Sequence, residues 1–174
     1  AVGGRLRIDG GEPAKNAFCA LPGNAGAQVA VFEVNQRTPG AFNTVDITCG
    51  SPNFSFRVNL PPSRYDLRVR PGQYAAQAGL GLPETAVLLR ENAPLSTLAS
   101  NSIFDVRTVT VRGRVEVDGS PLAGNAWCDD PGHAADEVAR VTFVEPRQGY
   151  RVAAPVRCSS PNFEFSARLP EPGR

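Results

Sequence analysis

The sequence predicts an all-β protein built from two tandem β-sandwiches, each closed by one disulfide. Three observations support this prediction. An internal repeat with an offset of 109 residues maps Cys49-Gly50-Ser51-Pro52-Asn53-Phe54 onto Cys158-Ser159-Ser160-Pro161-Asn162-Phe163 without a gap. The 17 glycines and 16 prolines lie between short apolar runs, as is typical of β-proteins. Each copy also contains two cysteines that are 30 residues apart.

Within each copy, apolar and polar residues alternate, which is the pattern of half-buried strands. In the first copy Ala30, Phe32 and Val34 are predicted to face the core, because Val31 on the opposite face is replaced by Arg140 in the second copy. A turn is expected at Asp9-Gly10-Gly11. Residues 91–101 are predicted to form a loop. The predicted strands of the first copy are 5–8, 29–34, 45–49, 54–60, 65–70 and 86–89, with a last strand at 104–106.

The boundary between the copies is predicted from a change of parity. Phe104 and Val106 fall on one strand face, whereas a second apolar set falls on the other, so one straight strand cannot serve a single core with both. The second set is Val109, Val111, Val115 and Val117. We therefore predict a first domain at 1–107 and a second at 108–174, joined by a short and stiff connection.

The second copy is incomplete at its C-terminal side relative to the first. Arg174 corresponds to Tyr65, so the strand at 65–70 and those after it have no counterpart in this sequence. Three explanations stay open: the sequence is part of a longer repeat array, the second domain uses fewer strands, or a strand from a neighbouring chain completes it.

The cysteine spacing predicts two disulfides within the copies, Cys19–Cys49 and Cys128–Cys158. Paired cysteines of this kind indicate an oxidising compartment, and hence an extracellular or cell-surface location. A zinc site of four thiolates is the alternative, although none of the cysteines belongs to a CxxC pair. Free buried thiols are the remaining one.

Part of each copy resembles a known family. The strand Val111-Arg112-Gly113-Arg114-Val115, followed by Asp118-Gly119, and the Phe-x-Phe strand that leads into Leu60 to Val69 (LPPSRYDLRV) are similar to the carboxypeptidase-regulatory-like, or transthyretin-like, modules. This resemblance implies an Ig-like β-sandwich, as found in repeat proteins of bacterial surfaces that act as spacers, stalks or adhesive units. A bacterial source is expected for this chain, and 17 of its 18 basic residues are arginine, which suggests a GC-rich genome.

One polar cluster in the second copy has the composition of a cation site. Asp129, Asp130, His133 and Asp136 supply carboxylates and an imidazole, and oxygen ligands would suit Ca²⁺. The equivalent positions of the first copy are uncharged, and the spacing fits no standard calcium loop. We predict a solvated loop, with these residues as weak metal candidates, and expect no metal and no cofactor.

Two aromatic residues are candidates for ligand contact. Trp127 precedes a cysteine, as Phe18 does in the first copy, and Tyr150 lies in a loop-like segment. An exposed Trp127 could stack on a sugar ring, whereas a buried one would fill the core beside the disulfide. Because the position is aromatic in both copies, the sequence favours the core.

Composition and motifs restrict the function. A net charge of +1 gives no electrostatic footprint for nucleic acid, and no apolar run is long enough to span a membrane. The chain lacks GxSxG, HExxH and phosphate-loop motifs, so we do not expect an enzyme. The prediction is a structural or adhesive module, namely a spacer, an adhesin stalk or a filament subunit, whose partners are further repeats or other copies. The alternative is a carbohydrate-binding module that contacts surface glycans through Trp127 and Tyr150.

Overall fold

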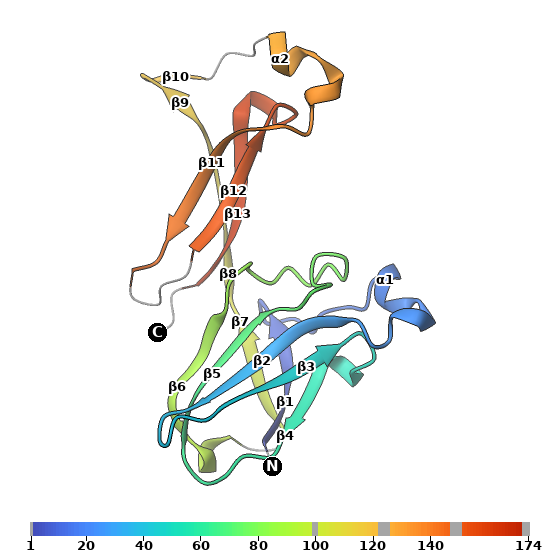
Figure 1. Ribbon diagram of the computed structural model, residues 1–174, viewed down its shortest axis with the longest axis vertical. Helices are drawn as coiled ribbons and strands as arrows, with labels where there is room; N and C mark the ends of the chain where they lie inside the picture. The colour runs from blue at the N-terminus through green and yellow to red at the C-terminus, as the bar shows by residue number, and fades with distance from the viewer. Residues whose placement is uncertain (1, 99–100, 122–125, 147–150, 172–174) are drawn as a thin grey trace. The chain divides into compact units, whose positions relative to one another are not determined.

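A computed structural model describes residues 2–98, 101–121, 126–146 and 151–171 of the chain. Strands hold 51% of the residues and short helices 14%, so the prediction of a mostly β chain is confirmed. The structure falls into two compact units (Figure 1). Unit 1 is Ala1–Thr108 with Pro170–Arg174, and unit 2 is Val109–Leu169.

Unit 1 contains two sheets. The first has the strand order β3-β2-β5-β6, and the second has the order β4-β1-β7, in which β1 and β7 are parallel (Figure 1). The strands are β1 Val2–Ile8, β2 Gln28–Gln36, β3 Phe42–Thr48, β4 Ser55–Val58, β5 Arg64–Pro71, β6 Val87–Pro94 and β7 Ser102–Val106. The short helices are α1 Ala17–Ala20, η1 Pro22–Asn24, η2 Pro52–Phe54 and η3 Leu95–Thr97.

The core of unit 1 is made by apolar side chains from both sheets. Phe32 of β2 is fully buried and lies 4.0 Å from Phe56 of β4 and 5.1 Å from Phe104 of β7, measured between ring centroids. Tyr65, at the start of β5, is also buried, and its hydroxyl donates a hydrogen bond to the carbonyl of Pro61. Burial raises the pKa of Tyr65. The predicted inward face of β2 is therefore correct.

The prediction that Val31 faces solvent is wrong, because Val31 is only 1% exposed. The segment after β5 hydrogen-bonds to the start of β2, where the N–H groups of Gly72 and Tyr74 donate to the carbonyls of Val29 and Gln28. That segment also buries Ala75, Ala78 and Leu80, so β2 has cover on both faces. Alternation within one strand carries no information about cover that a distant segment supplies.

Two predicted boundaries also shift. The strand expected at 54–60 is only four residues long, because Asn53 and Phe54 have positive φ in the turn that precedes β4. The loop expected at 91–101 begins as strand, since β6 continues to Pro94 through Asn92, another residue with positive φ.

Unit 2 holds two-stranded sheets and a small core. Its core cluster contains three buried residues, Val152, Ala154 and Ala167, with Phe143, Phe165 and Leu169 packed against them. The strands are β8 Thr108–Arg114, β9 Glu116–Val117, β10 Ser120–Pro121, β11 Glu137–Val144, β12 Arg151–Arg157 and β13 Glu164–Pro170. The short helices are α2 Ala126–Asp129, η4 Pro131–His133 and η5 Pro161–Phe163.

The β11–β12 pair has the register of the β2–β3 pair. Phe32 opposes Val45 in unit 1, and Val141 opposes Ala154 in unit 2, each 109 residues further along. A register irregularity follows the first pair in both cases, between Gln28 and Ala30 and between Glu137 and Ala139.

The expectation that Val109 and Val117 serve the core of unit 2 is wrong, since they are 46% and 55% exposed. Leu6 of β1, by contrast, is 1% exposed, while its equivalent Val115 is half-buried. In unit 1, β7 lies beside β1 and contributes Phe104 to the core. Among the described residues of unit 2, no strand pairs with β8 in the position of β7.

Close packing requires a glycine on the first strand of each unit. A Cβ atom on Gly4 would lie 2.5 Å from the Phe104 ring, and one on Gly113 would lie 2.7 Å from the Phe165 ring. We expect Gly4→Ala to destabilise the chain by about 1–3 kcal/mol, because the rigid ring must shift inside a packed core. Gly113→Ala should cost less, because Phe165 is only half-buried. Urea denaturation of both variants tests this, and an unchanged midpoint for Gly4→Ala would contradict the packing.

Asp66 makes unit 1 sensitive to acid. Burial disfavours its charged form, but hydrogen bonds from the Asn92 N–H (2.7 Å) and the Arg37 guanidinium (2.9 Å) outweigh burial and hold the pKa of Asp66 below its ordinary value. A lowered folded-state pKa adds stability above the unfolded-state pKa, and this stability is lost as the pH falls through the folded-state value.

We therefore expect Asp66→Asn to destabilise the chain by about 1–2 kcal/mol at pH 7. The difference from the parent chain should shrink below about pH 4, where the unfolded-state carboxyl becomes protonated. Urea denaturation between pH 7 and pH 3 measures both effects. Asp46→Asn, at an exposed position of β3, is the control. A deficit that stays constant with pH would show that the Asp66 charge is irrelevant.

Candidate functional site

The two predicted disulfides are present and lie at equivalent places. Cys19 in α1 is bonded to Cys49 after β3, and Cys128 in α2 is bonded to Cys158 after β12, each pair 30 residues apart. In unit 1 the Asn16 side chain caps α1 by accepting from the Cys19 N–H at 3.2 Å. The local backbone is also equivalent, since the Cys49 N–H donates to Ala27 and the Cys158 N–H donates to Asp136.

The two bridges differ in exposure. Cys19 and Cys49 are 7% and 1% exposed, whereas Cys128 and Cys158 are half-buried. The first bridge is part of the main core of unit 1. The second lies outside the small buried cluster of unit 2.

Trp127 is the centre of the most distinctive surface cluster in unit 2. Its side chain is 56% exposed, so the core position that the sequence favoured is wrong. The indole stacks on the His133 ring with centroids 3.6 Å apart, and its Nε1–H donates to Asp136 Oδ2 at 3.1 Å. The same carboxylate oxygen lies 2.8 Å from His133 Nδ1. Asp136 thus fixes both rings, and we call Trp127, His133 and Asp136 the aromatic platform.

Unit 1 has no such platform, and its sequence explains the difference. Phe18, the equivalent of Trp127, is half-buried against the core and lies 5.8 Å from Tyr74 of the segment after β5. Asn24 and Ala27 replace the histidine and the aspartate. An aromatic residue at this position therefore packs inward only where the segment after β5 supplies a partner.

The predicted metal candidates do not converge on a common point. Asp130 accepts a hydrogen bond from the Gly132 N–H at 2.8 Å and caps η4, whereas Asp136 is engaged by Trp127 and His133. Asp129 is exposed in α2. Across the described ranges, no three carboxylate, imidazole or thiol groups come together as a metal site. Tyr150 lies outside the described residues.

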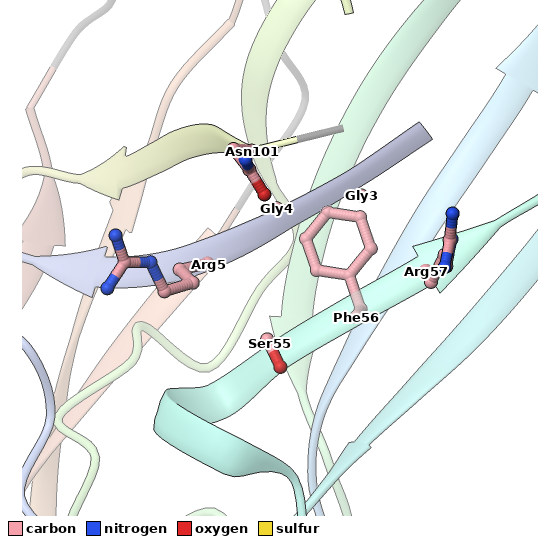
Figure 2. Close-up of a pocket in the computed structure, with 7 residues that line it drawn as sticks. All are labelled: Gly3, Gly4, Arg5, Ser55, Phe56, Arg57 and Asn101. Atoms are coloured by element: carbon pink, nitrogen blue, oxygen red, sulfur yellow. The ribbon is translucent and has the colours of Figure 1, made fainter. Parts of the chain in front are cut away.

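Strand pairing leaves a hollow of about 750 Å³ over β1 and β4 in unit 1. Figure 2 shows the Phe56 ring in this hollow, with Arg5 and Arg57 to either side. An equivalent hollow of about 630 Å³ lies over Gly113 and Phe165 in unit 2. Glu164 and Ser166 replace Ser55 and Arg57 there, so the two hollows do not share a ligand chemistry. Arg5 is also paired with Glu12 at 3.0 Å.

Sequence reasoning found the members of the platform but not their association. Trp127 was predicted as an isolated aromatic, and His133 and Asp136 as part of an acidic loop. The three-residue spacing of His133 and Asp136 at the end of η4 is the signal that could have joined them, because such a turn brings positions i and i+3 together.

None of the helices in the described part of the chain is long and apolar enough to cross a membrane. Comparison of the chain with models of protein families, with curated proteins and with solved structures gives no match.

Proposed function

We propose that the chain is a non-catalytic structural or adhesive module of the extracellular space or a cell surface, acting as a spacer, an adhesin stalk or a filament subunit. In this proposal it consists of two Ig-like sandwiches of the carboxypeptidase-regulatory-like type that arose by duplication. The observation that carries the proposal is the disulfide of each unit, which joins the same two elements at the same spacing. Such bridges persist in oxidising compartments.

The strand arrangement supports the duplicated sandwich. The β2–β3 and β11–β12 pairs have the same register at the 109-residue offset, including the irregularity at their ends. In unit 1, rings from both sheets meet in one core, as the layers of a sandwich do. The hydrogen bond from the Tyr65 hydroxyl to the carbonyl four residues earlier is similar to the tyrosine corner of Ig-like folds.

The environment of His133 supports a non-catalytic role. It is the only histidine of the chain, and its ring is stacked on Trp127 while its Nδ1 contacts Asp136. No serine, threonine or cysteine among the described residues has a printed contact with this imidazole, as a base-activated nucleophile would need.

Labelling of intact producing cells tests the proposal. Lys15 is the only lysine of the chain and is exposed, so a membrane-impermeant amine reagent should modify it without cell lysis. The proposal expects equal labelling before and after lysis. Labelling that requires lysis would contradict a surface location. A cytosolic protein of the same cells serves as the control for membrane integrity.

The aromatic platform favours a second candidate function, carbohydrate binding by unit 2. Trp127 is exposed and held in one orientation, which lowers the entropic cost of stacking a sugar ring on it. Asp129 is exposed in the same helix and could accept hydrogen bonds from sugar hydroxyls.

If this second function holds, Trp127→Ala should weaken glycan binding by about tenfold or more, because a central tryptophan commonly dominates an interface. Phe42→Ala is the matched control, since Phe42 is 59% exposed and belongs to unit 1. A glycan array probed with the parent chain and both variants gives the result. Equal binding by all three proteins, or none by the parent chain, would reject the carbohydrate function.

A further inference from the structure

One side of β11 is not used by any strand in the described part of unit 2. In unit 1, β2 lies between β3 and β5 (Figure 1). In unit 2, β11 pairs with β12, its equivalent of β3, and within the described ranges no second strand takes the place of β5. We call the side of β11 away from β12 the open edge. Backbone groups along such an edge are a template for another strand.

The apolar face of β11 shows the same lack of cover. Ala30, Phe32 and Val34 of β2 are each 0% exposed, whereas their equivalents Ala139, Val141 and Phe143 are only half-buried. Unit 2 also contributes five of the eight large apolar residues that are most exposed: Val109, Val117, Trp127, Val138 and Val144. Its side chains are arranged for a core that the described residues only begin to fill.

Unit 1 shows which chemistry fills this place. β5 runs antiparallel to β2 and inserts Tyr65, Leu67 and Val69, each 0% exposed, into the core. Its register places Val69 opposite Phe32 and Leu67 opposite Val34. At the 109-residue offset, the same register would place a valine opposite Val141 and a leucine opposite Phe143.

We propose that the open edge of β11 accepts an antiparallel strand from a second polypeptide, with the Tyr-x-Leu-x-Val alternation of β5. The β5 strand of the chain itself cannot fill this role, because β2 and β6 pair with it on both sides. The added strand satisfies the backbone of the edge and buries Val141 and Phe143, the two sources of affinity in strand addition. This inference rests on the proposed structural function and names the contact through which such modules join.

A peptide with the sequence of residues 63–71 is the probe. Labelled at its N-terminus and added to the full oxidised chain, it should raise fluorescence anisotropy and slow hydrogen exchange in β11. Phe143→Asp should weaken binding by about tenfold or more, because it places a charge on the face that the strand buries. Thr142→Asp is the matched control, since Thr142 is exposed on the opposite face and should leave binding unchanged.

A peptide with Leu67→Asp and Val69→Asp should not bind, because it keeps the length but loses the apolar alternation. Self-association of the chain that the parent peptide reverses would also support the proposal and identify the donor as a second copy. Absence of peptide binding, or equal binding to the Phe143→Asp variant, would overturn it. Cell-surface labelling of Lys15 is independent of this result, so failure of the open edge and failure of the structural function are distinguishable.

Discussion

Replacing Phe32 by alanine is expected to destabilise unit 1 by about 3–5 kcal/mol, the range for removing a buried aromatic ring. Phe32 is 0% exposed and contacts Phe56 and Phe104, so its ring links the two sheets. Its loss leaves a cavity between layers that strand pairing holds in place, and the neighbours can close it only in part. Urea denaturation followed by far-UV circular dichroism measures the change.

The matched control is Phe42→Ala, which removes the same ring from a strand of the same sheet. Phe42 is 59% exposed, so this variant should change the free energy of unfolding by less than about 0.5 kcal/mol. A small effect at Phe32, or equal effects at the two positions, would contradict the two-sheet core.

Removing the disulfide of unit 1 is the second change with a large expected effect. The Cys19→Ala/Cys49→Ala double variant should lose roughly 3–4 kcal/mol, the chain entropy of a loop of this size. Both cysteines belong to the main core, so the substitutions also remove buried contacts. Denaturant midpoints of the parent chain and the double variant measure the loss.

The equivalent change in unit 2 provides the comparison. Cys128 and Cys158 close a loop of the same length, but the core cluster of unit 2 has only three buried residues. We expect the Cys128→Ala/Cys158→Ala variant to lose the β11–β12 pairing altogether, measured by hydrogen exchange at those strands. This bridge should also be reduced first by added thiol, because its cysteines are more exposed. Protected β11–β12 amides in the variant would contradict a dependence on the bridge.

Local pattern was sufficient for the strand pairs and the cysteines. The alternation of Ala30, Phe32 and Val34 predicted the buried face of β2, and spacing alone predicted both disulfides. These features depend on residues close in sequence, or on a repeat that shows the same arrangement twice.

The errors have a common physical cause, which is cover supplied by distant segments. Val31 is buried because residues beyond β5 return to β2, while Val117 is exposed although its parity matches the core. Trp127 was expected in the core by analogy with Phe18, but the burial of Phe18 depends on Tyr74. Sequence spacing could propose Trp127, His133 and Asp136 as polar or aromatic candidates, but it could not show that one carboxylate holds both rings.

The central claim is that each unit carries its own disulfide in the mature protein. Each cysteine lies in a different tryptic peptide, namely 16–37, 38–57, 115–140 and 158–168. Peptide mapping without reduction, on protein alkylated as it is isolated from its natural cells, therefore distinguishes every pairing. We predict that 16–37 is linked to 38–57 and 115–140 to 158–168. Alkylated cysteines, or a link between the two pairs, would contradict the account.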